Sequence, residues 1–389
     1  MNPQRKNTLI IYGASYFWSL TTLMVMSTLT IYHEHVLGIS KMHLGSIQAY
    51  AVLSMYGTKM ISGILIDIFK NYKMVLIFGS ILSMIARPMF AFVSGPFSIF
   101  LLRSFERLTK GVRAGPADAF LTINQQQENI GQAVAYKQVS YTLGAMSGAL
   151  TASVFLYFYP DHFAMLYKLS IIPGLLATIL LFYIEPIPFT EKKSTNRFQW
   201  EQIKNFPGVL YFMYFLAFAV TAARFGENFV GHRFYEYGAP TPFLPLVYII
   251  YDLPWCLISF FLAKRLDQHD FKKTLLFGLV FLFSANILLL SSNHLIGLIA
   301  GTICAGVYAA TVQGILTTAI AKMTQKDVRG TAFAIYYVVV GLGFFTSFKL
   351  TGYFAHAFNT WRMGFFGQTI ISFLLILLVL LLPKRFFKD

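Results

Sequence analysis

Long apolar segments alternate with short polar connections along the whole chain. Each segment has close to the ~20 residues that an α-helix needs to cross the hydrocarbon layer of a membrane. The twelve segments lie near 9–31, 45–66, 74–95, 97–121, 131–157, 164–184, 208–231, 242–263, 273–292, 296–320, 331–355 and 364–382. The pattern predicts an all-α integral membrane protein with twelve transmembrane helices. The first segment follows Arg5 and Lys6 but lacks a small-residue cleavage site, so we expect a retained helix rather than a signal sequence.

The composition and the placement of charge agree with this class. Charged residues make up 12% of the chain, against about 25% in soluble domains. The net charge of +15 could indicate nucleic-acid binding, but eighteen of the 31 Lys and Arg residues fall in connections on one predicted side and four on the other. This asymmetry predicts that both termini lie in the cytoplasm and that the protein is a multi-pass protein of the inner (cytoplasmic) membrane, with no nucleic-acid partner.

The segments fall into two groups of six. A polar stretch at 186–207 is predicted to be a cytoplasmic linker between an N-terminal half, 1–185, and a C-terminal half, 208–389. A faint repeat at an offset near 200 crosses this linker and pairs Asp67 with Asp267, Lys73 with Lys273, Gly131 with Gly330 and Gly144 with Gly343. Several matches in the same order favour duplication. Two duplicated six-helix halves are typical of transporters whose substrate site lies near the membrane midplane.

The fourth segment carries an unusual number of charges for a transmembrane helix. Six ionisable residues fall within roughly 140° of one helical face; they are Arg103, Glu106, Arg107, Lys110, Arg113 and Asp118. Ionisable residues at membrane depth are costly and usually functional. One interpretation is an anion site, since guanidinium groups bind carboxylate and phosphate well. The alternative is internal pairing with Glu106 and Asp118.

Further charges fall in other predicted helices. Lys137 in the fifth and Arg224 in the seventh segment add to the positive charge and are further candidates for substrate binding. Glu227 follows Arg224 by three residues, so the two side chains can pair, either as a static salt bridge or as a proton-controlled switch. Asp252 is the other acid in the predicted membrane region. Lys59, Arg87 and Lys349 also lie within predicted spans, and their orientation stays open.

The sequence offers little for metal or redox chemistry. Cys256 and Cys304 lie in separate predicted spans and are expected to serve packing. The cluster His33-Glu34-His35 is expected in a solvated loop at the outer end of the first span. No nucleotide-binding P-loop motif is present, so we expect no cofactor and no ATP-driven pump.

Several motifs together resemble those of the major facilitator superfamily. Gly63, Asp67 and Lys73 match the family pattern between the second and third helices, although Phe69-Lys70 replaces its second glycine. Arg107, Gly111 and Gly115 resemble the Arg-and-glycine pattern of the fourth helix, and ERLTKGVRAGPADA resembles a variant in a bacterial subgroup. The resemblance implies a central cavity between the halves. It also implies a cytoplasmic conformational gate, formed by Gly63, Asp67, Lys73, Asp267 and Lys273.

One departure from the family bears on function. The fifth segment reads LGAMSGALTA, without the proline that drug–proton antiporters of the family often carry there. This disfavours a drug antiporter and leaves Gly144 and Gly148 as close helix-packing positions.

Together these features predict a monomeric secondary transporter that moves a small organic anion by alternating access, with proton coupling. Four or more cations are more than a monocarboxylate needs, so a polycarboxylate, a phosphorylated metabolite or a citrate-type siderophore fits better. Export of a drug or siderophore is the alternative. An embedded enzyme or a ligand sensor is less favoured, because no nucleophile–base pair, metal cluster or sizeable output domain is evident.

Overall fold

The computed structural model describes residues 3–69, 71–123, 130–185, 206–263, 271–324 and 329–383, and every secondary-structure element within them is helical. The chain divides into two compact units. The first unit comprises residues 1–190 and 238–252, and the second comprises 191–237 and 253–389. Residues 186–205 of the predicted linker at 186–207 lie outside the described residues. The division of the chain into halves at this linker therefore stays a prediction.

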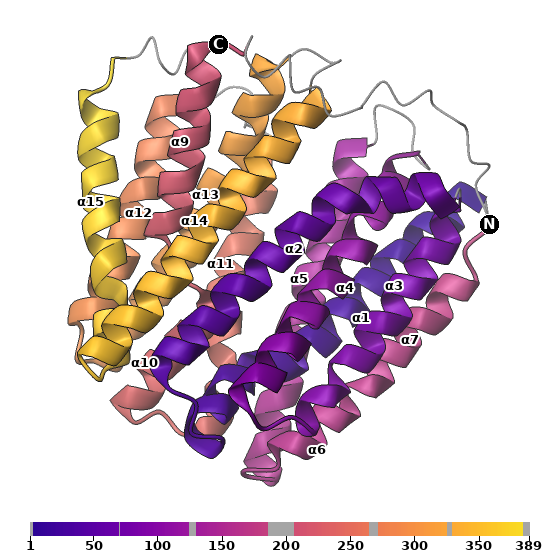
Figure 1. Cartoon of the computed structure of the whole chain (residues 1–389), viewed down its shortest axis with the longest axis horizontal. Coiled ribbons are helices and arrows are strands. Elements are labelled where there is room, and N and C mark those ends of the chain that lie inside the picture. The colour runs from indigo at the N-terminus through magenta and orange to yellow at the C-terminus, as the bar shows by residue number, and fades with distance from the viewer. Residues whose placement is uncertain are drawn as a thin grey trace. The chain divides into compact units, whose positions relative to one another are not determined.

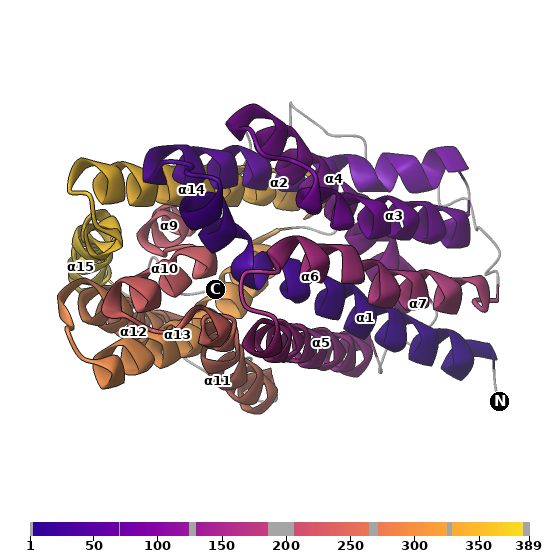
Figure 2. The ribbon, with the colours of Figure 1, turned by 90° about the horizontal axis from the view of Figure 1, so that it is seen from below.

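The first unit contains the N-terminal helices, coloured indigo to magenta in Figure 1. Its elements are α1 (Pro3–Ile31), η1 (Tyr32–Val36), α2 (Lys41–Phe69), α3 (Tyr72–Ala86), η2 (Pro88–Ala91), α4 (Pro96–Ile123), α5 (Ile130–Phe158), α6 (Phe163–Leu169), α7 (Ile171–Phe182), η4 (Thr241–Phe243) and the beginning of α11 (Leu246–Ala263). Within this unit α1 packs against α5 and α7, and α4 packs against α2 and α3 (Figures 1 and 2). The helix α4 therefore has neighbours that can cover its charged face.

The second unit contains most of the C-terminal helices. Its elements are α9 (Gly208–Ala223), α10 (Glu227–Tyr237), the end of α11, α12 (Phe271–Ser291), α13 (Leu295–Met323), α14 (Arg329–Ala357), η6 (Trp361–Phe365) and α15 (Phe366–Leu381). Within it α12 packs against α13 and α15, and α14 packs against α9 (Figure 1).

Each predicted membrane segment has a helical counterpart. Ten stretches in the described part of the chain are long and apolar enough to cross a membrane. The other two counterparts are α2 and α4, with 29 and 28 residues, which is also sufficient length. The helix α4 is not among the ten apolar stretches because it carries several charged residues. The predicted twelve-helix, all-α membrane fold is confirmed.

The sixth and seventh spans are interrupted, which the apolar pattern did not indicate. The sixth is divided into α6 and α7 near Ser170, and the seventh into α9 and α10 at residues 224–226. Backbone carbonyls freed inside a membrane must find other partners. At the second interruption Asn286 donates to the carbonyl of Ala223 at 3.0 Å, and Ser347 donates to that of Arg224. Side chains of α12 and α14 therefore stabilise the interrupted helix.

Close helix contacts at glycines occur at corresponding places in the two units. A Cβ on Gly144 would overlap the backbone carbonyl of Tyr16, so α5 and α1 touch backbone to backbone. A Cβ on Gly343 would lie 2.8 Å from the carbonyl oxygen of Phe218, so α14 meets α9 in the same way. The predicted role of Gly144 in close packing agrees with this contact.

Lysine side chains give a second sign of the repeat. The Nζ of Lys73 donates to the carbonyls of Phe182 and Ile184 at 2.7 and 2.8 Å, beyond the end of the sixth span. In the second unit Lys272 donates to the carbonyls of Leu380 and Leu382, at the end of the twelfth. The structural counterpart of Lys73 is therefore Lys272 rather than the neighbouring Lys273, and the repeat offset is 199.

Enlarging Gly144 should separate α1 from α5. We expect Gly144→Ala to lower the free energy of unfolding by about 1–3 kcal/mol, as overpacking does elsewhere. Gly57→Ala is the matched control, because a Cβ there would meet no atom within 4 Å. Thermal unfolding of both variants in detergent measures the difference. Equal unfolding temperatures would show that the α1–α5 contact tolerates a methyl group.

Candidate functional site

The charged face of α4 points into the first unit. Arg103, Glu106 and Arg113 expose 0%, 1% and 3% of their surfaces. On the opposite side of the helix Leu101, Phe105 and Leu108 are exposed. Successive residues of a helix are rotated by about 100° around its axis, so the exposed and buried positions of α4 form two different faces. The apolar face is left for lipid, and the charged face is turned towards protein.

An ion pair lies at the centre of the buried face. The Nη1 of Arg103 donates to the Oε2 of Glu106 at 2.7 Å. The other edge of the same guanidinium donates from Nε and Nη2 to the amide oxygen of Gln48 on α2, at 3.1 and 3.0 Å. The amide of Gln48 therefore fixes the orientation of Arg103 without adding charge.

Two more arginines share the Glu106 carboxylate. Arg107 of α4 brings its Nε to 3.7 Å from Oε2. Arg87, at the end of α3, brings its Nη2 to 4.0 Å from Oε1, and the same nitrogen donates to the Oγ1 of Thr22 at 2.8 Å. The sequence left the orientation of Arg87 open, and the structure places this fully buried side chain in the α4 cluster.

Arg113 is held without a carboxylate. Its guanidinium lies 4.5 Å from the centre of the Trp18 ring on α1, and its Nε donates to the Oγ of Ser83 on α3 at 3.2 Å. The Nη2 is buried and has no hydrogen-bond partner among the described residues. No ion pair to Arg113 is found in that part of the chain either. A fixed, buried guanidinium with an open donor is suited to bind an anion.

Lys110 is also held by a neutral group. Its Nζ donates to the hydroxyl of Tyr141 on α5 at 3.0 Å and lies 5.4 Å from the centre of that ring. The predicted cations of α4 are thus positioned by aromatic and amide side chains of α1, α2 and α5.

Asp118, the second acid predicted on the charged face of α4, does not neutralise the cations of the cluster. Asp118 pairs with Lys137 of α5, and its side chain is 59% exposed. The alternative of internal pairing therefore holds for Arg103 and Glu106 but not for the cluster as a whole. Among the described residues the cluster contains five cations, namely Arg87, Arg103, Arg107, Lys110 and Arg113, against one carboxylate, an excess of four charges.

The second unit has no such cluster at the corresponding positions. A Cβ added to Gly79 of α3 would lie 2.9 Å from the Cβ of Arg113, and one added to Gly278 of α12 would overlap the side chains of Val312 and Thr311 in the same way. With this register of 199 residues, the α13 counterparts of the α4 charges are Thr302, Ala305, Gly306, Ala309 and Val312. The fold of a half therefore does not require the charges, which points to a functional role in the first unit.

The remaining predicted residues form separate groups. Arg224, where α9 ends, pairs with Glu227 at the start of α10 and lies 4.8 Å from the centre of the Phe344 ring. Asp252 is buried in α11. The side chains of Gly63, Asp67 and Asp267 lie outside the described residues, so the gate motif is visible only through Lys73 and the exposed Lys273.

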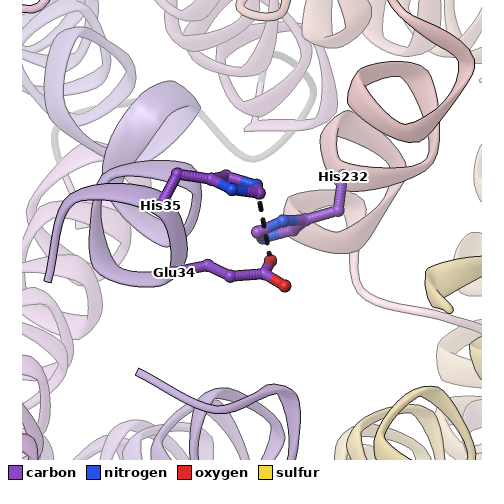
Figure 3. A group of neighbouring side chains, drawn as sticks. All are labelled: Glu34, His35 and His232. Carbon is purple, nitrogen blue, oxygen red and sulfur yellow. Dashed lines mark ion pairs between the residues drawn. The ribbon is translucent and has the colours of Figure 1, made fainter. Parts of the chain in front are cut away.

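The outer end of α1 differs from the expectation of a solvated loop. Residues 32–36 continue the helix as η1, and His33 is 1% exposed between the rings of Tyr32 and Phe90. Glu34 pairs with Lys41 at 2.9 Å and lies 3.7 Å from the Nε2 of His35, the pair marked by the dashed line in Figure 3. The rings around His33 explain why this residue is buried, whereas His35 and Val36 of the same segment are exposed.

Residues missed by the sequence reasoning are mostly neutral. Gln48, Ser83 and Tyr141 position the cations, and none belongs to a charged pattern. An amide or hydroxyl in an apolar segment is a weak signal, because Ser and Tyr also occur at many sites that only pack. Gln48 within an otherwise apolar stretch was the clearest available sign.

Comparisons with known proteins address the family. A family model described as Major Facilitator Superfamily matches residues 9–264 and again 234–388. An uncharacterized MFS-type transporter of Methanocaldococcus jannaschii is 24% identical over 265 residues, which cover 65% of this chain and 64% of the relative. The match thus spans less than two thirds of the relative's own length.

Solved structures agree on the fold. A mutant of the nucleoside transporter NupG has a TM-score of 0.82 at 14% identity, covering 98% of this chain and 100% of that chain. A D-xylose–proton symporter has a TM-score of 0.76 at 16% identity, covering 99% of both chains. The matched family model, the twelve helices and these neighbours lead to one conclusion. The chain belongs to the Major Facilitator Superfamily and is a multi-pass membrane protein.

Proposed function

We propose that this transporter moves a small organic anion across the cytoplasmic membrane by alternating access, with proton coupling. The observation that carries the proposal is the excess of four positive charges buried around α4. Buried charge without a partner is costly, so such an excess is stable only if counter-charge or water reaches it. An anionic substrate would supply that counter-charge during each transport cycle.

The contacts of the cluster favour particular cations as the binding groups. Arg103 is already engaged by Glu106 and Gln48, and therefore serves the structure. Arg113 and Lys110 contact only neutral side chains among the described residues. We assign substrate binding first to Arg113 and Lys110, with Arg107 at the edge of the site.

The size of the charge excess and the aromatic neighbours suggest the substrate class. A polycarboxylate, a phosphorylated metabolite or a citrate-type siderophore carries several negative charges, as the cluster requires. Trp18 and Tyr141 offer ring surface for the carbon part of such an anion. A nucleoside and D-xylose, named for the two solved neighbours, are neutral, so the proposal rests on the residues of this chain.

The proton step is assigned to the second unit. Glu106 is surrounded by three arginines, which stabilise its carboxylate form. Glu227 has a single arginine partner within 4 Å in the described part of the chain, and its side chain is 31% exposed. Protonation of Glu227 would release Arg224, which is the simplest switch that the described acids offer.

Neutralising Arg113 should weaken anion binding selectively. We expect Arg113→Gln to reduce the affinity for the transported anion by about ten- to a hundredfold, since a hydrogen bond to a charged group contributes about 1.5–3 kcal/mol. Lys110→Gln should act in the same direction. Lys168→Gln on α6 is the control, because this exposed cation lies near Phe92 and outside the cluster.

The measurement is thermal stabilisation of the purified protein by di- and tricarboxylates, sugar phosphates, citrate-based chelators and cationic drugs, followed by flux of the best ligand in liposomes. Bound ligand appears as added stability when it is in excess. Stabilisation only by neutral or cationic compounds, equal in all three variants, would contradict an anion transporter.

The structural role of Glu106 can be separated from the binding role of Arg113. Glu106→Gln leaves three arginines without their carboxylate, and we expect it to lower the free energy of unfolding by about 3–5 kcal/mol. Arg113→Gln removes a charge that has no carboxylate partner among the described residues, so stability should be unchanged or higher. Thermal unfolding without ligand measures both. A Glu106→Gln protein as stable as the parent would instead indicate a protonatable acid with no structural role.

A further inference from the structure

A row of polar side chains on α1 faces the α4 cluster. Ser15, Ser19, Thr22 and Met26 fall within about 60° of one face at 100° per residue. Thr22 accepts from Arg87 and the sulfur of Met26 accepts from Arg103, so two members of the row touch two arginines of the cluster. The face that carries Ser15 and Ser19 is therefore turned towards the cations.

The two serines are buried without a hydrogen-bond partner. Both are 0% exposed, and neither Oγ has a partner among the described residues. Two threonines of α1 bond instead to the carbonyl one turn earlier, Thr8 to Gln4 at 2.9 Å and Thr22 to Trp18 at 2.6 Å. Buried polar groups are nearly always paired, so two open hydroxyls on one face indicate a polar partner that arrives from elsewhere.

A third hydroxyl lies at the same place. Tyr141 accepts a hydrogen bond from Lys110, which leaves its own O–H able to donate. Ser19 lies beside this hydroxyl without meeting hydrogen-bond geometry. The site thus combines cations from α4 with hydroxyls from α1 and α5.

The two kinds of group recognise different parts of a ligand. Lys and Arg only donate hydrogen bonds, and so they suit the oxygens of carboxylate or phosphate. A serine hydroxyl can also accept, and that capacity is used when the ligand has an O–H donor. We propose that the transported anion carries a hydroxyl group beside its acidic groups, as a hydroxycarboxylate or a hydroxylated phosphate ester does, and that Ser15 and Ser19 bind this hydroxyl. The proposal rests on the proposed anion transport.

Pairs of ligands that differ in hydroxyl groups test the inference. Suitable pairs are citrate with tricarballylate, malate with succinate, and glycerol 3-phosphate with propyl phosphate. Thermal stabilisation and equilibrium binding are measured for the parent protein and for the double variant Ser15→Ala with Ser19→Ala. Ser27→Ala is the matched control, because Ser27 is also buried in α1 and without a hydrogen-bond partner in the described part. It lies eight residues, or about 12 Å, beyond Ser19.

We expect the parent to bind the hydroxylated member of one pair at least about tenfold more tightly, and the double variant to reduce that preference to about twofold. Binding of the member without the hydroxyl should change little in either variant. Equal binding of both members by the parent would overturn the hydroxyl inference and leave anion transport standing. A preference that survives in the double variant, or is lost in Ser27→Ala, would overturn the assignment to Ser15 and Ser19. Failure of all six ligands, with stabilisation by neutral or cationic compounds, would overturn the anion proposal and this inference together.

Discussion

The first unit depends on the compensation of charge around one carboxylate. Glu106 contacts Arg103 directly and lies within 4.0 Å of Arg87 and Arg107, which come from α3 and α4. A low-dielectric interior makes each of these charges costly alone, and the shared carboxylate lowers that cost for three of them. Neutral partners hold the cations that remain. A single helix face therefore carries two kinds of arginine. Arg103 is paired and fixes the bundle, whereas Arg113 has no carboxylate partner among the described residues and is the ligand-binding group of our proposal.

Duplication makes this division easier to recognise. The same glycine contacts and the same lysine–carbonyl bonds occur in both units, which indicates that the helical framework of a half forms without a charged cluster like that of α4. Where α4 has Arg113, α13 has Val312, and both side chains pack beside a glycine of the third helix in their half. The same packing position thus carries a charged group in α4 and an apolar one in α13. The difference between the copies is a stronger indication of function than the charge by itself.

Much of the fold and part of the site followed from sequence. Apolar segments of the right length predicted all twelve spans, because a membrane requires long helices whose backbone groups bond internally. The charged face of α4 and the Arg224–Glu227 pair also followed, since neighbours on one helix can be read from spacing. Contacts between helices could not be read in this way. The sequence did not indicate that Arg87 joins Glu106 or that Asp118 turns to Lys137, because both depend on how α3, α4 and α5 are rotated. The interruptions of the sixth and seventh spans were also missed, since both spans remain apolar on average over their whole length.

The ring of Trp18 gives the site an optical property. Its indole donates to Ser80 at 2.9 Å and lies against the Arg113 guanidinium, so the chromophore is held in one position beside one charge. Indole excited states respond to nearby electric fields, and an anion at Arg113 would cancel much of the field that Trp18 experiences. The chain contains four tryptophans, and Trp18 is the one that lies against Arg113. Emission from Trp18 would therefore report occupancy of the site proposed at Arg113, and would follow loading and release in real time without any attached dye.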